Sequence, residues 1–92
     1  METKAFLHTV RKNIKEIVKI KLYCDTPFPR WLTWRLVRNS IYMYDCGESY
    51  ANVRMLTDID ELFKELCNCV TENTVSATIK YSDDSKDTYH FK

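Results

Sequence analysis

The chain has 92 residues, which is the size of one domain, because a core divided between two halves would be marginal without disulfides or metals. Its 45% hydrophobic content excludes a disordered chain, and no apolar run is long enough to span a membrane. The net charge of +1 hides an asymmetry: nine basic and three acidic residues precede residue 40, and five basic and ten acidic residues follow. We expect a single domain, residues 1–92, with halves of opposite charge.

The N-terminal segment predicts an amphipathic helix from residue 3 to about residue 22. Its apolar residues recur at helical spacing, most clearly up to Val18. Basic residues on the other side of this helix would form a ridge. A second interpretation stays open, because residues 17–24 (IVKIKLYC) alternate with the period of a strand.

Two prolines, Pro27 and Pro29, predict a connection, since proline removes a backbone donor and restricts the residue before it. The segment from Pro29 to Asn39 begins with proline and ends in basic residues, which favours a short second helix. Residues 31–37 (WLTWRLV) are also compatible with a strand.

From Ser40 the pattern changes to that of a hairpin. Residues 41–45 and 50–56 are rich in aromatic and β-branched residues and flank Gly47, the only glycine of the chain. A helix is then predicted from Thr57, as N-cap, to about Thr71.

The C-terminal segment predicts a second hairpin, with residues 75–81 and 88–91 as strands and the polar residues 82–87 as the turn. The predicted fold is α+β, in the order α-α-β-β-α-β-β. It has a four-stranded antiparallel sheet made of the two hairpins, with two or three helices packed on one face.

No residue pattern indicates catalysis, a metal or a cofactor. One glycine excludes a glycine-rich phosphate cradle, and a pairing of Cys46 with His8 or His90 would be arbitrary. Cys67 and Cys69 lie about 200° apart around a helix and would not share a zinc ion. We expect a non-enzymatic protein.

The compartment follows from the cysteines. Without a secretory signal, the four cysteines are expected as reduced thiols in the cytoplasm. The acidic turn of residues 83–87 lacks the glycine and glutamate of an EF-hand loop, so we read it as a solvated turn.

Two charged surfaces are candidate binding sites. The basic surface suits a nucleic acid or a protein partner and comprises Arg11, Lys12, Lys15, Lys19, Arg30, Arg35 and Arg38. The acidic surface suits a basic groove on a protein partner and comprises Asp58, Glu61, Glu65, Asp83, Asp84 and Asp87.

In size and architecture the chain resembles the small, glycine-poor, non-enzymatic α+β proteins of phages and mobile elements, such as anti-CRISPR inhibitors. No diagnostic motif carries this resemblance, which implies a protein that covers a surface of a host machine. The leading hypothesis is a protein-binding module that inhibits a nucleic-acid-handling complex. The alternative is direct nucleic-acid binding through the basic N-terminal helix, and the opposite charges of the two halves also allow a homodimer.

Overall fold

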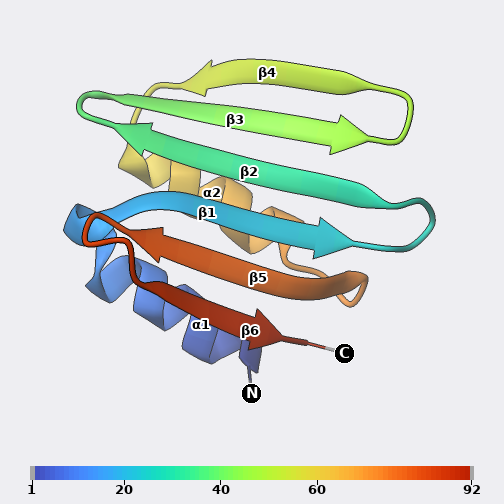
Figure 1. Cartoon of the computed structure of the whole chain (residues 1–92), viewed down its shortest axis with the longest axis horizontal. Helices are drawn as coiled ribbons and strands as arrows, with labels where there is room; N and C mark the ends of the chain where they lie inside the picture. The colour runs from blue at the N-terminus through green and yellow to red at the C-terminus, as the bar shows by residue number, and fades with distance from the viewer. Residues whose placement is uncertain (1, 92) are drawn as a thin grey trace.

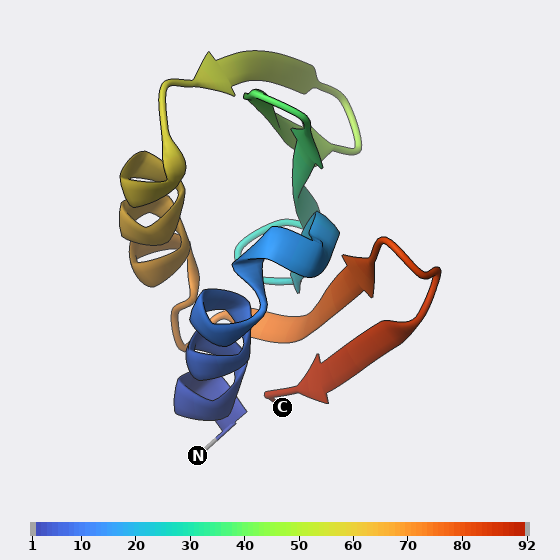
Figure 2. The ribbon, with the colours of Figure 1, turned by 90° about the vertical axis from the view of Figure 1, so that its left-hand side faces the viewer.

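A computed structural model describes residues 2–91 and has two α-helices on one face of a six-stranded antiparallel sheet (Figures 1 and 2). The elements follow in the order α1 (Glu2–Lys12), a 3-10 turn (Ile14–Glu16), β1 (Ile17–Cys24), β2 (Arg30–Val37), β3 (Ser40–Gly47), β4 (Ala51–Leu56), α2 (Ile59–Cys69), β5 (Thr74–Tyr81) and β6 (Lys86–His90). Across the sheet the strands are ordered β4-β3-β2-β1-β5-β6.

The α+β class is as predicted, but the four-stranded sheet is wrong. Residues 17–24 and 30–37 form strands β1 and β2, so the order is α-β-β-β-β-α-β-β and only two α-helices occur in residues 2–91. Strand β1 lies between β2 and β5, with Ile20 opposite Trp34 on one side and Ile79 on the other. Pairing on both sides satisfies the backbone N–H and C=O groups of β1. Both partner strands lie outside this segment, so the local pattern of residues 17–24 could not reveal the pairing.

Helix α1 stops at Lys12, ten residues before the predicted end. Asn13 still donates its N–H to the Thr9 carbonyl at 3.0 Å, and a 3-10 turn then leads into β1. The β-branched residues Ile17, Val18 and Ile20 favour the strand that follows.

Helix α2 begins one residue later than predicted. Its N-cap is Asp58, whose carboxylate accepts the Glu61 N–H at 2.9 Å, rather than Thr57. Thr57 instead donates its N–H, at 2.8 Å, to the carboxylate of Glu61. The predicted capping chemistry is present, displaced by one position.

The core lies between the two helices and the face of the sheet that they cover. Phe6 and Val10 of α1 and Leu62 and Leu66 of α2 are fully buried. The sheet contributes the alternating positions Ile20, Leu22, Leu32, Trp34, Ile41, Met43, Ala77 and Ile79. The opposite face carries no helix, and we call it the open face; Figure 1 looks onto it.

The two tryptophans test this alternation. Trp34 is fully buried, whereas Trp31, three residues earlier, is on the open face. We expect Trp34→Ala to lower the free energy of unfolding by about 3–5 kcal/mol, because it leaves a cavity, and Trp31→Ala to lower it by much less. Urea unfolding of both variants measures this. Equal losses would contradict the strand assignment of β2.

Candidate functional site

Three rows of side chains cross the open face, because directly paired residues of neighbouring strands point to the same side. The first row is Met55, Tyr42, Arg35, Lys19, Lys80 and Lys86, from β4 to β6. The second is Val53, Tyr44, Thr33, Lys21, Thr78 and Thr88. The third is Ala51, Cys46, Trp31, Tyr23, Ser76 and His90.

The rows contain basic and aromatic residues but no aspartate or glutamate at any of their positions, all of which the structure describes. None of these residues is buried. The acidic residues of β3 and β6, Asp45 and Asp87, pair with Leu32 and Ile79 and so belong to the other face. The open face is therefore strongly positive in a chain whose total charge is close to zero.

The cations are concentrated where β1 begins. Lys19 is directly opposite Arg35 on one side and Lys80 on the other. These three residues line a shallow hollow of about 500 Å³ together with Thr33, Tyr44 and Cys46. Like charges placed directly opposite each other destabilise a sheet.

Within residues 2–91, one carboxylate forms an ion pair with this cluster. Asp84, in the β5–β6 turn, lies 3.8 Å from the Lys80 ammonium, and its side chain is 90% exposed. An ion pair this exposed contributes little, so most of the repulsion remains.

Four aromatic residues occupy the β1, β2 and β3 part of the open face. The rings of Tyr23 and Trp31 lie 5.4 Å apart and are tilted by 32°. Tyr42 and Tyr44 stand two residues apart on β3, and all four side chains are half-buried. Their partly exposed rings form a surface on which a planar group can stack.

The predicted basic residues do not form one surface. Lys19 and Arg35 lie on the open face, whereas Arg11 and Lys12 belong to α1, where the Arg11 guanidinium is 4.6 Å from the centre of the Phe63 ring. The remaining three are Lys15 in the 3-10 turn, Arg38 in the β2–β3 turn and Arg30 at the start of β2. The expected ridge is lost because the helix that would align it ends at Lys12.

Lys80 and Lys86 were not predicted to belong to the basic surface, because they come from the acidic half of the sequence. They join the open face through β5 and β6. Lys21 was missed because it was placed at the end of the first predicted helix, and Tyr23 was missed because it directly follows that helix. The alternation of apolar and polar residues in residues 17–24, which is typical of a strand, was the signal that places Lys21 and Tyr23 on the same face.

The predicted acidic residues are also divided. Asp58, Glu61 and Glu65 belong to α2 and its N-cap, while the other three lie in or beside the β5–β6 turn, which projects to the opposite side of the molecule from α2 (Figure 2). Asp83 accepts the Ser85 N–H at 3.0 Å, and Asp87 accepts the Tyr81 hydroxyl at 2.6 Å. Hydrogen bonding to Ser85 lowers the pKa of Asp83, as bonding to Thr57 lowers that of Glu61.

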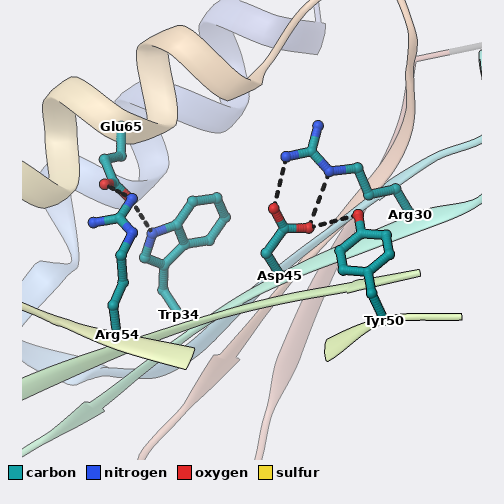
Figure 3. A network of polar contacts seen from close by, with 6 residues as sticks. All are labelled: Arg30, Trp34, Asp45, Tyr50, Arg54 and Glu65. Atoms are coloured by element: carbon teal, nitrogen blue, oxygen red, sulfur yellow. Dashed lines mark hydrogen bonds and ion pairs between the residues drawn. The ribbon is translucent and has the colours of Figure 1, made fainter. Parts of the chain in front are cut away.

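Two polar networks tie β4 and its neighbours to the rest of the fold (Figure 3). Arg30 makes two hydrogen bonds with Asp45, at 3.0 and 2.8 Å, and the Tyr50 hydroxyl donates to Asp45 at 3.0 Å. The Tyr50 ring lies over Gly47, where a Cβ would stand 2.2 Å from a ring carbon, so any larger residue there would displace the Tyr50 ring. Across the sheet, Glu65 accepts the Trp34 indole N–H at 3.1 Å and pairs with Arg54.

The cysteines and histidines form no catalytic or metal-binding arrangement within residues 2–91. All four cysteines are free thiols, and no group of three or more potential metal ligands occurs there. Cys46 lies in β3, not in a tight turn, and four strand spacings, about 19 Å, separate it from His90 in β6. No helix in the same range is long and apolar enough to cross a membrane.

A scan against protein-family models found no match for this chain, and searches of curated proteins and of solved structures found none either.

The Asp45 network gives a pH test. Hydrogen bonding from Arg30, and to a smaller extent from Tyr50, lowers the pKa of Asp45. We expect an NMR titration to place that pKa below the ordinary value of about 3.9, Arg30→Gln to raise it most and Tyr50→Phe to raise it less.

The corresponding stability contribution is fully present above the unfolded-state pKa and is lost as the pH falls through the lower folded-state pKa. Asp45→Asn should therefore flatten the acid limb of the free energy of unfolding. An Asp45 pKa at or above the ordinary value would contradict the network.

Proposed function

We propose that the protein binds single-stranded nucleic acid on the open face of its sheet. The observation that carries this proposal is the combination, on one uncovered surface, of a row of cations and a set of half-buried aromatic rings, with no carboxylate at any of the described positions of the three rows. Cations attract phosphates, and aromatic faces stack with unpaired bases.

The phosphate backbone is assigned to the row through Arg35, Lys19, Lys80 and Lys86. In the free protein these cations repel one another, since each is directly opposite the next across the sheet. A phosphate between two of them would turn that repulsion into attraction. The hollow lined by Lys19, Arg35 and Lys80 provides a place for such an anion.

The bases are assigned to the aromatic residues. Trp31 and Tyr23 lie in the third row, and Tyr44 lies in the second, beside the hollow. A strand advances about 3.3 Å per residue, so successive rows lie about 7 Å apart. A strand of nucleic acid can therefore contact the cations of the first row while its bases extend over the other two.

The shape of the surface favours single strands over a duplex. The major groove of B-DNA admits a helix or a two-stranded ribbon, and a six-stranded sheet face is wider than either. In a duplex the bases are already stacked and cannot lie on Trp31 or Tyr44. We thus propose direct nucleic-acid binding on the open face of the sheet, and not on the N-terminal helix.

The protein-binding and inhibitor roles expected from the sequence remain predictions. No observation in residues 2–91 identifies a protein partner, and Asp58, Asp83 and Asp87 of the predicted acidic surface are engaged in local hydrogen bonds.

Fluorescence anisotropy with a labelled single-stranded oligonucleotide of random sequence tests the proposal. We expect Lys19→Gln/Arg35→Gln/Lys80→Gln to weaken binding and to reduce the slope of log K against log salt by about 2, since each lost phosphate contact removes about 0.7. The matched control, Lys4→Gln/Lys12→Gln/Lys64→Gln, removes the same charge from the exposed side of the helices and should leave the slope nearly unchanged.

The aromatic contribution needs a separate variant. Trp31→Ala should cost about 1–3 kcal/mol of binding free energy, with little change in the salt slope, because stacking releases no counterions. Absence of binding at low salt, or equal losses in the sheet and helix triple variants, would refute the proposal.

A further inference from the structure

The two edges of the sheet differ in a way that bears on self-association. Strand β6, at one edge, has the sequence KDTYH and carries charged side chains at its start. Strand β4, at the other edge, has the sequence ANVRML, with no proline and no irregularity in its pairing with β3. Its one charged residue, Arg54, is paired with Glu65 of α2.

Strand β4 therefore lacks three of the features that keep edge strands apart, namely prolines, bulges and unpaired lysines. Its exposed apolar residues stand on the open face: Val53 is 61% exposed and Met55 is 59% exposed. Such an edge presents unpaired backbone N–H and C=O groups to any strand of suitable register.

The hydrogen-bond pattern shows which residues hold those groups. The Gly47 N–H donates to the Tyr50 carbonyl at 3.0 Å, so these two residues form a hydrogen-bonded pair of the β3–β4 hairpin. Hydrogen-bonded and non-hydrogen-bonded pairs alternate along an antiparallel ladder. Asn52, Arg54 and Leu56 thus bond to β3, and the backbone groups of Ala51, Val53 and Met55 point away from the sheet.

We propose that β4 pairs with β4 of a second copy of the chain, antiparallel and centred on Val53. In this register Val53 lies opposite its own copy and Ala51 lies opposite Met55, so the outward groups of all three residues form hydrogen bonds. The side chains match as well, because apolar residues meet on the open face and Asn52 meets Arg54 on the other.

Neighbouring registers are poorer. Centring the pair on Arg54 places two like charges opposite each other, which destabilises antiparallel pairs. Centring it on Met55 places Val53 opposite Thr57, which lies beyond the end of β4. The register centred on Val53 pairs the three residues with outward backbone groups, Ala51, Val53 and Met55, with one another. It is isologous, as a two-fold dimer requires.

The dimer would join two six-stranded sheets edge to edge and place their open faces side by side. The inference depends on the edge of β4 alone and does not require the open face to bind nucleic acid. Its test uses the full chain with no oligonucleotide, so that failure of one proposal is distinguishable from failure of the other.

Sedimentation equilibrium over a range of concentrations is the first measurement. We expect a monomer–dimer equilibrium in the wild type, and Val53→Lys should weaken the dimer about tenfold or more, since it places two lysines opposite each other on the axis. The matched control is Thr88→Lys, which adds the same charge to the exposed open face of β6 and should leave the equilibrium unchanged.

Amide hydrogen exchange of the wild type gives a second measurement that needs no variant. Exchange at Ala51, Val53 and Met55 should slow as the protein concentration rises, while Asn52 and Arg54, already bonded to β3, should change little. A chain that stays monomeric at the highest attainable concentration, or a dimer that Val53→Lys leaves intact, would overturn the inference.

Discussion

The one-sided cover of the sheet is the constraint on which the rest of the structure depends. Two helices of 11 residues pack on one face of six strands. Because side chains alternate along a strand, apolar residues fill the covered face, and residues that can be exposed to solvent fill the open face. Exposure to solvent explains why polar residues occupy this face, but it does not explain why Lys19 lies between two other cations, Arg35 and Lys80. Because this arrangement costs free energy in the free protein, we propose that an anionic ligand relieves it.

Much of the fold was predictable because local signals agreed with the final structure. The β3–β4 hairpin around Gly47, helix α2 and the β5–β6 hairpin were all expected from alternation, capping and turn residues. Residues 17–24 and 31–37 were ambiguous because Ile17 and Ile20 suit either period, and Pro29 suits the start of a helix as well as a loop before a strand. Pairing with distant residues decided both: Ile20 lies between Trp34 and Ile79.

The candidate site was predictable only in part, for the same reason. Lys19 and Arg35 were identified as members of a basic surface, but the surface was drawn on a helix that ends at Lys12. Lys80 and Lys86 reach it only because β5 pairs with β1, a contact between segments some 60 residues apart. A division of charge along the sequence cannot detect a division of charge between two faces of a sheet.

The most direct test of this account uses the two tryptophans as reporters, since one stands on each face of β2. In a two-dimensional NMR titration with a short oligothymidylate, the indole N–H signal of Trp31 should move progressively. That of Trp34, which is buried and bonded to Glu65, should stay in place. An unchanged Trp31 signal, or shifts confined to residues of α1 and α2, would contradict the assignment of the open face as the working surface.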